Sequence, residues 1–234
     1  MMKTNSTLLI LDLDGTIVNS LDFIIKCFQD AVAPLLKQMP TGKSIVASFG
    51  PSENECIARV LRASEKENTT LNPIAEQDIE SAAKRFHSQY RQGVENGAVH
   101  LFKGMKEVME DAQQRDWPMA IFTGKGRASA IETLEQFDLL NAFGIITTSE
   151  DVPASKPAPD GIIQTMKQMN AQPSQTIMVG DHPADIQAAH CAGVTSIAAL
   201  WGAFDKSATL AARPDHALET PNDLRLFLQQ WKMG

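Results

Sequence analysis

The sequence predicts an α/β fold, in which a block of helices is inserted just after the first strand of a parallel sheet. The first observation is a strand-length apolar run at residues 8–11. The second is the segment 17–95, where apolar residues recur only at helical spacing. From Val99 onward, short apolar strands alternate with amphipathic helices. This alternation is typical of βαβ units, whose strands lie parallel.

The first strand leads directly into Asp12 and Asp14, and Gly15 follows them. In a regular strand, side chains two residues apart point to the same face, so we expect both carboxylates on one face. Two carboxylates at the end of a buried strand are unfavourable without a positive partner. A divalent cation, which prefers oxygen ligands, would satisfy them. Taken alone, an Asp-Gly hairpin turn is the alternative interpretation of this motif.

We expect three helices and no strand in the inserted block. Apolar side chains recur there at intervals of three and four residues, which places them on one face of each helix. Asn19 or Ser20 can cap the first helix, and Ser52 can cap the second. Asn96-Gly97 ends the block. The expected helices cover residues 17–36, 52–66 and 73–95.

The remainder of the chain completes the predicted sheet. We therefore expect an α/β core domain made of residues 1–16 and 97–234, and a helical domain made of residues 17–96. The strands that we expect after the block cover residues 119–122, 145–148, 176–179 and 196–200. The helices that we expect there cover residues 104–115, 129–137, 160–170, 184–192 and 222–231.

Composition excludes several function classes. The 234 residues carry a formal net charge of −7, which argues against general binding to nucleic acid or to anionic membranes. The three cysteines are widely spaced and indicate neither a zinc site nor a disulfide framework. The N-terminus does not look like a signal peptide, and no apolar run is long enough to cross a bilayer. We expect a cytoplasmic protein, and the sequence indicates no oligomeric state.

Polar residues follow three of the expected strands, and a lysine precedes a proline in a loop between two of them. The carboxyl ends of parallel strands meet at one edge of a sheet, where ligands bind. Carboxylates there can hold a cation, a lysine can hold an anion, and a hydroxyl with a backbone N–H can hold an oxygen. These groups together suit phosphoryl transfer. The residues concerned are Asp12, Asp14, Thr123, Gly124, Lys156, Asp181 and Asp185.

Each of these residues also has an ordinary explanation on its own. Thr123 could be a helix cap, and Lys156 could be a solvated surface lysine. Asp181 and Asp185 could lie at a helix N-terminus, where acidic residues are favoured anyway. The four motifs in this order, at the ends of strands, favour the catalytic interpretation.

The ordered set resembles the haloacid dehalogenase-like (HAD) hydrolase superfamily, in the group of phosphoglycolate phosphatase-like and β-phosphoglucomutase-like members. The resemblance covers essentially the whole chain and implies a Rossmann-like core with an inserted α-helical cap, here residues 17–96. The matching motifs are Asp12-Leu-Asp14-Gly-Thr16, Thr123, Lys156 and Gly180-Asp181-His-Pro-Ala-Asp185.

The resemblance also implies an activity, namely Mg²⁺-dependent hydrolysis of a small phosphate monoester, phosphoglycolate-like or a sugar phosphate. Asp12 would be the nucleophile that forms an aspartyl-phosphate, and Asp14 would be the general acid and then the general base. Thr123, the Gly124 N–H and Lys156 would bind the phosphoryl group. Mg²⁺ would be held by the side chains of Asp12 and Asp181 and by the backbone carbonyl of Asp14, with Asp185 in the outer shell.

The inserted block contains a loop that we expect to reach over Asp12. Its residues are Phe49, Gly50, Pro51 and Ser52, and a glycine there permits close approach of the backbone to a ligand. We expect this loop to contact the non-phosphate part of a small, polar phosphate monoester. A simple turn before the helix at Ser52 is an equally good interpretation.

Alternative activities remain open on the same scaffold. β-Phosphoglucomutase-like mutases carry a cap arginine in the loop that corresponds to residues 49–53, which has no basic residue here, although Lys43 and Arg59 lie near it in sequence. An inorganic pyrophosphatase and a non-catalytic binding module are further possibilities. A dehalogenase is disfavoured, because that branch does not keep an acid at the position of Asp14.

The chain departs from the pattern of many relatives at two places. Many relatives have Asp-Ser where this chain has Asn19-Ser20, and Asn where it has Gly124. Both departures concern the identity of the substrate.

Overall fold

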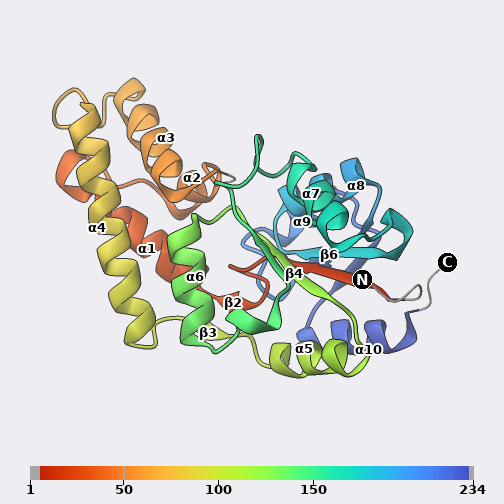
Figure 1. The fold of residues 1–234 in the computed structure, drawn as a ribbon. Helices are drawn as coiled ribbons and strands as arrows, with labels where there is room; N and C mark the ends of the chain where they lie inside the picture. The colour runs from red at the N-terminus through yellow and green to blue at the C-terminus, as the bar shows by residue number, and fades with distance from the viewer. Residues whose placement is uncertain (1–5, 50, 232–234) are drawn as a thin grey trace.

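The computed structural model describes residues 6–49 and 51–231. Its centre is a six-stranded sheet in the order β5-β4-β1-β6-β7-β8, and every neighbouring pair of strands is parallel (Figure 1). The strands are β1 (Leu8–Leu11), β4 (Met119–Phe122), β5 (Ile145–Thr147), β6 (Thr176–Gly180), β7 (Thr195–Ala199) and β8 (His216–Leu218).

Strand β1 is completely buried because helices cover both faces of the sheet. Leu8 and Ile10 pack with the side chains of α7 and α8, whereas Leu9 and Leu11 belong to the cluster that includes α5 and α10. In Figure 1, α5 and α10 lie below the sheet, and α7, α8 and α9 lie above it. The helices of this part of the chain, with α6 included, are α5 (Met105–Gln114), α6 (Arg127–Gln136), α7 (Asp160–Met169), α8 (Pro183–Ala192), α9 (Lys206–Ala211) and α10 (Pro221–Gln230).

Strand order reverses at β1, which pairs with β4 on one side and with β6 on the other. Connections from the two halves of the sheet leave in opposite directions at such a point, so a crevice opens beyond the carboxyl ends of the strands. Asp12 follows β1 at this position.

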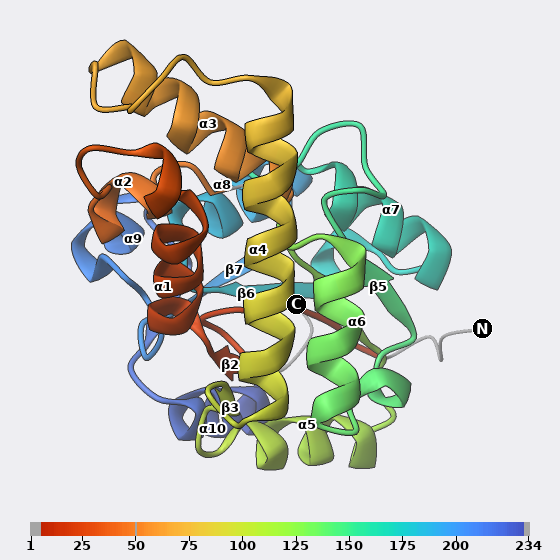
Figure 2. The same cartoon turned by 90° about the vertical axis from the view of Figure 1, so that its left-hand side faces the viewer.

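Four helices form a separate layer at the left of Figure 1, and Figure 2 views the molecule from that side. The longest of them, α4, packs against α1, α3 and the core helix α6. Aromatic side chains fill this layer, with the rings of Phe28 and Phe86 4.6 Å apart. We call these helices, residues 21–95, the cap. They are α1 (Leu21–Val32), α2 (Gly42–Val46), α3 (Glu53–Lys66) and α4 (Glu76–Glu95).

A short antiparallel ribbon lies where the chain enters and leaves the cap. It pairs β2 (Val18–Asn19) with β3 (His100–Leu101). The two connections to the cap are therefore hydrogen-bonded to each other. The assignment of residues 17–96 to one domain and of the remainder to another stays a prediction.

Most expected elements are present, and the differences have local causes. The expectation of no strand in the inserted block was wrong at β2, because a two-residue strand carries no period-2 signal. The first helix begins at Leu21 and not at residue 17, since Gly15 (φ +80°) turns the chain and Val18 is extended. Helices α2 and α9 were missed, since five and six residues span too few turns for periodicity. The edge strand β8 has only three residues and was missed for the same reason.

Among residues 6–49 and 51–231, three further helical turns are 3₁₀ helices, at Ala33–Leu35, Leu140–Ala142 and Pro173–Gln175. Within the described chain we find no helix with both the length and the apolar character needed to cross a membrane.

Candidate active site

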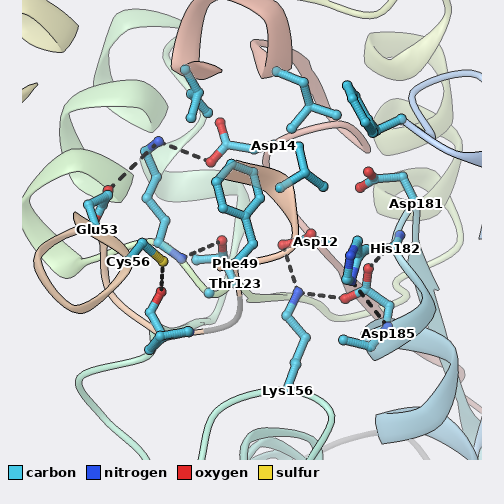
Figure 3. Close-up of a pocket in the computed structure, with 18 of the residues that line it drawn as sticks. Asp12, Asp14, Phe49, Glu53, Cys56, Thr123, Lys156, Asp181, His182 and Asp185 are labelled. Atoms are coloured by element: carbon cyan, nitrogen blue, oxygen red, sulfur yellow. Dashed lines mark hydrogen bonds and ion pairs between the residues drawn. The ribbon is translucent and has the colours of Figure 1, made fainter. Parts of the chain in front are cut away.

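A cavity lies at the carboxyl end of the sheet, between the sheet and the cap (Figure 3). Its volume is about 100 Å³. The sheet side contributes Asp12 after β1, Thr123 after β4, and Asp181 after β6. Three strands that are adjacent in the sheet but distant in sequence therefore bring their terminal polar residues to one place, as the sequence predicts.

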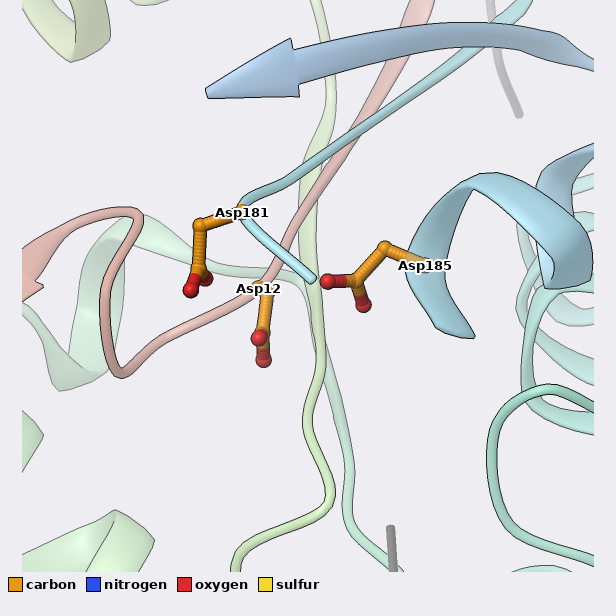
Figure 4. Close-up of side chains that lie close together, drawn as sticks. All are labelled: Asp12, Asp181 and Asp185. Carbon is orange, nitrogen blue, oxygen red and sulfur yellow. The ribbon is translucent and has the colours of Figure 1, made fainter. Parts of the chain in front are cut away.

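Three carboxylates are clustered beside this cavity. Asp12, Asp181 and Asp185 each offer an oxygen, and the three oxygens lie within 4.8 Å of one another (Figure 4). All three residues are buried, with exposed fractions between 0% and 8%. Buried carboxylates so close together require positive charge nearby.

Lys156 supplies part of that charge. Its Nζ lies 3.0 Å from Asp12 Oδ1 and 2.5 Å from Asp185 Oδ1, and it donates a hydrogen bond to the carbonyl oxygen of Phe122. The lysine is 7% exposed. Burial favours the neutral amine, but the charges of Asp12 and Asp185 outweigh it and raise the pKa of Lys156. Lys156 is therefore a permanent cation in contact with Asp12.

One lysine does not balance three carboxylates. Burial, opposed by Lys156 and reinforced by Asp185, raises the pKa of Asp12 to about 7. Burial and the charge of Asp12 likewise raise the pKa of Asp181 well above its usual value. Burial is the main cause of both shifts, and the cluster has three carboxylates beside one lysine, which leaves a deficit of positive charge. A group of carboxylate oxygens with this deficit fits a divalent cation such as Mg²⁺ or Ca²⁺.

Local contacts fix the direction of two of these carboxylates. Thr16 Oγ1 donates to Asp181 Oδ1 at 3.1 Å, and the backbone N–H of His182 donates to Asp185 Oδ2 at 3.0 Å. Gly15 packs directly on Asp181, since a Cβ there would lie 2.4 Å from Asp181 Oδ2. The glycine after Asp14 is therefore needed for its positive φ and for this close approach.

Asp14 lines the same cavity but has different partners. Its Oδ2 lies 3.0 Å from Lys125 Nζ, and its Oδ1 accepts a hydrogen bond from Ser20 Oγ at 2.6 Å. Strand β1 ends at Leu11, so strand alternation does not set the directions of Asp12 and Asp14. The carboxylate of Asp14 is outside the cluster of Figure 4. Its expected metal contact was through the backbone carbonyl, and that contact stays a prediction.

The hydroxyl of Ser20 binds a carboxylate of the cavity and does not cap its helix. Ser20 occupies the N-cap position of α1, as the sequence predicts, but its hydroxyl makes no capping hydrogen bond. The hydroxyl instead donates to Asp14. The start of the cap is thereby connected to a carboxylate of the cavity.

Lys125 is a charged residue of the cavity that the sequence analysis did not single out. Its ammonium lies 3.0 Å from Asp14 Oδ2, 4.0 Å from Glu53 Oε1 and 3.9 Å from the centroid of the Tyr90 ring. Burial favours the neutral amine, but Asp14, Tyr90 and Glu53 raise the pKa of Lys125. The only available signal was its position two residues after Thr123, because both carboxylate partners are distant in sequence.

Glu53 joins the cap to the core at this point. It lies in the first turn of α3, is 7% exposed, and accepts a hydrogen bond from the backbone N–H of Gly126 at 2.7 Å through Oε2. Its other oxygen, Oε1, has an ion pair with Lys125 but no hydrogen bond. The cap wall of the cavity therefore contains a buried carboxylate.

The remaining predicted site residues are placed as follows. Thr123 and Gly124 line the cavity, and the Thr123 hydroxyl accepts a hydrogen bond from the backbone N–H of Lys125. From the predicted cap loop, Phe49 and Pro51 line it, whereas Ser52 is the N-cap residue of α3 and is not among the described lining residues. Gly50 lies outside the described residues.

Comparison with known proteins shows the family of the chain. A model of the family described as haloacid dehalogenase-like hydrolase matches residues 9–199. The chain belongs to this family. As a haloacid dehalogenase-like hydrolase, it is an enzyme, and its parallel sheet has the order of strands that positions Asp12 at the centre.

Individual relatives of this haloacid dehalogenase-like hydrolase are distant. Phosphoglycolate phosphatase from Escherichia coli O157:H7 is 27% identical over 224 residues, covering 91% of this chain and 88% of that protein. Pyrophosphatase PpaX from Bacillus mycoides is 24% identical over 229 residues, covering 98% and 99%.

Solved structures show the same fold. A predicted phosphoglycolate phosphatase from Haemophilus somnus superposes with a TM-score of 0.84 at 22% identity, covering 98% of this chain and 100% of that one. CbbY from Rhodobacter sphaeroides, in complex with phosphate, gives 0.79 at 18% identity, covering 94% and 96%.

Proposed function

We propose that this hydrolase is a Mg²⁺-dependent phosphatase that hydrolyses a small phosphate monoester through an aspartyl-phosphate on Asp12. The observation that carries the proposal is the position of Asp12. It follows the central strand, contacts Lys156, and shares a buried cluster with Asp181 and Asp185. The phosphatase names of several relatives support the same reaction.

The residues present fit the metal that this activity needs. We infer that the side chains of Asp12 and Asp181 and the backbone carbonyl of Asp14 would hold Mg²⁺, with Asp185 farther out. When bound, the ion would supply the positive charge that the cluster lacks and neutralise phosphoryl oxygens.

In the proposed first step, a carboxylate oxygen of Asp12 attacks phosphorus and the bond from phosphorus to the leaving oxygen breaks. Asp14, in its protonated form, gives its proton to that leaving oxygen. In the second step, water attacks the phosphorus of the aspartyl-phosphate, Asp14 takes a proton from the water, and the bond to Asp12 breaks. Inorganic phosphate leaves, and both carboxyl groups return to their starting state.

Three further groups would hold the phosphoryl oxygens. These are the Thr123 hydroxyl, the Gly124 N–H and the Lys156 ammonium, all of which line the cavity. Lys156 is well placed for this task, because it is already in contact with Asp12 and would neutralise charge on both nucleophile and phosphate.

A mutase activity is less well supported. The described lining of the cavity includes neither Lys43 nor Arg59, the two basic residues near the cap loop. Arg59 pairs instead with Glu55, and Lys43 is exposed. No cap arginine is therefore placed to hold the second phosphate of a phosphosugar within the described residues.

We also propose that residues 17–96 act as a cap domain over a core of residues 1–16 and 97–234. The net charge of −7 and the position of the cavity between the sheet and the cap suit a free metabolite better than nucleic acid or a membrane. We infer a cytoplasmic enzyme.

The proposed function predicts Mg²⁺-dependent release of phosphate from 4-nitrophenyl phosphate. Activity should disappear when EDTA removes the metal and should return when excess Mg²⁺ is added. β-Glucose 1-phosphate should yield free phosphate and not glucose 6-phosphate. No turnover under any of these conditions would contradict the proposed phosphatase function, and glucose 6-phosphate as the product would replace phosphatase by mutase.

Metal binding should depend on pH in a defined direction. The pKa of Asp12 is raised from 3.8 to about 7 in the folded protein. For a raised carboxyl pKa, the stability contribution is present at low pH and is lost as pH rises through about 7. Mg²⁺ competes with protons for the same oxygens. We therefore expect Mg²⁺ to raise Tm more at about pH 8 than at about pH 6.

Differential scanning fluorimetry with and without Mg²⁺ at both pH values measures this effect. Asp181→Asn should abolish the Mg²⁺ effect. Asp138→Asn should preserve it, because Asp138 is exposed and remote from the cavity. A Mg²⁺ effect of equal size at both pH values would show that the cluster is not the site of binding.

A further inference from the structure

The cavity has two ends of different chemistry. The end formed by the sheet holds the carboxylate cluster, Thr123 and Lys156, which we assign to the phosphoryl group. The other end is formed by the cap and must hold the leaving group of the substrate. Its side chains therefore select which phosphate monoester is accepted.

Apart from Glu53, the described cap side of the cavity is an apolar wall. In Figure 3 the ring of Phe49 projects into the space beside Asp12. The ring lies 5.7 Å from that of Phe28 between centroids, so the two aromatic side chains support each other. Such a surface offers contact to hydrocarbon and no hydrogen bond to a polar group. The apolar residues of the wall include Leu21, Ile24, Phe28, Val46, Phe49 and Cys56.

The charges around the cavity disfavour a second anion on the substrate. Within the described lining, the lysines are Lys125 and Lys156, and both come from the core. The single charged residue that the cap contributes to this lining is Glu53, a carboxylate. A carboxylate or a second phosphate on the leaving group would face apolar side chains and a like charge. An uncompensated buried charge of this kind is strongly unfavourable.

Lys125 does not make the cavity more favourable for a second anion on the substrate. Its ammonium lies between Asp14 and Glu53, over the ring of Tyr90, and its side chain is only 3% exposed. The Lys125 ammonium is therefore already held by Asp14 and Glu53. To hold a substrate anion, Lys125 would have to leave Glu53 and Tyr90, which are buried.

We propose that the preferred substrate is a compact phosphate monoester whose leaving group is apolar and carries no second negative charge. The proposal rests on the proposed phosphatase function and narrows it. It replaces the polar leaving group that the sequence suggested, and it separates this chain from relatives named for phosphoglycolate and pyrophosphate. The requirement for a compact group comes from the position of the cavity, whose lining is shared between the carboxyl end of the sheet and the cap.

Isobutyl phosphate and 2-phosphoglycolate form a matched pair for the test. Both have a primary alkoxide as leaving group and the same number of non-hydrogen atoms, but only glycolate carries a carboxylate. We expect kcat/KM with Mg²⁺ to be at least roughly tenfold higher for isobutyl phosphate. Pyrophosphate should be as poor a substrate as phosphoglycolate. 4-Nitrophenyl phosphate shows independently whether the chain is a phosphatase.

Substitutions in the apolar cap wall should change the preference for isobutyl phosphate over phosphoglycolate. Phe49→Arg places a cation in the wall and should raise the phosphoglycolate-to-isobutyl ratio of kcat/KM at least roughly tenfold. Leu21→Arg does the same from a partly exposed position, in case Phe49→Arg does not fold. Leu71→Arg is the matched control, because Leu71 belongs to the cap but is 52% exposed and outside the described lining. It should leave the ratio unchanged.

Calorimetric titration of the Asp12→Asn variant separates the two proposals. Tighter binding of isobutyl phosphate than of phosphoglycolate, without turnover of any ester by wild type, would sustain the specificity and overturn the phosphatase function. Turnover of 4-nitrophenyl phosphate with phosphoglycolate or pyrophosphate as the better substrate would sustain the function and overturn the specificity. An unchanged ratio in both folded arginine variants would also overturn the specificity.

Discussion

Asp12→Asn should lower kcat by roughly 10³-fold or more while the protein remains folded. An amide cannot attack phosphorus to form the covalent intermediate, and it is a poorer metal ligand than a carboxylate. Lys156 keeps Asp185 as a partner at 2.5 Å, so the substitution leaves no buried ammonium unpaired. Steady-state kinetics with 4-nitrophenyl phosphate and Mg²⁺ measure the loss.

The Tm of Asp12→Asn distinguishes a loss of catalysis from misfolding of the variant. Burial raises the pKa of Asp12 to about 7, so ionising this carboxyl at about pH 8 is less favourable in the folded chain than in the unfolded chain. Asparagine carries no charge and avoids this loss. We therefore expect metal-free Asp12→Asn to have an equal or higher Tm than metal-free wild type at that pH.

Asp138→Asn is the control, since Asp138 is exposed and has φ 56°, a conformation that asparagine adopts equally well. It should change neither kcat nor Tm. Appreciable turnover by Asp12→Asn, free of contaminating wild type, would exclude covalent catalysis through Asp12. A large fall in Tm would instead point to a structural role for this carboxylate.

The strand ends were predictable because their signals are local. The apolar runs before Asp12, Thr123 and Asp181 have the length of buried strands, and parallel sheets gather their carboxyl ends at one edge. The convergence of these three residues follows from that rule alone. A local signal singled out Lys156 as a cation for an anion, but not its contacts, because its ion pairs with Asp12 and Asp185 join distant parts of the chain.

The cap end of the cavity was not predictable in the same way. Ile24 and Phe28 have helical periodicity that identifies them as buried, but not whether they face other helices or a ligand. That depends on how α1 lies against the core. Glu53 and Lys125 illustrate the same point, since each is an ordinary charged residue in sequence. Only the packing of the cap over the segment after β4 buries them together.

Asp14→Asn should slow hydrolysis according to the leaving group. Asparagine has no proton to give to a departing oxygen, and a primary alkoxide needs that proton far more than a nitrophenolate does. We expect kcat for isobutyl phosphate to fall roughly 10²–10⁴-fold, the range typical of general acid–base catalysis. The fall for 4-nitrophenyl phosphate should be several times smaller, limited by the loss of the base in the second step.

The dependence on the leaving group separates this role from the pairing of Asp14 with Lys125. Asp14→Asn weakens an ion pair of a buried ammonium, so a lower Tm is expected in any case. A purely structural effect would reduce the turnover of both esters by the same factor, because it changes the amount of active enzyme. Asp22→Asn, in the exposed first turn of α1, should leave both rates unchanged and lower Tm only slightly, through the lost interaction with the helix dipole. Equal losses for the two esters would remove the acid role from Asp14 and leave it as the residue that positions Lys125.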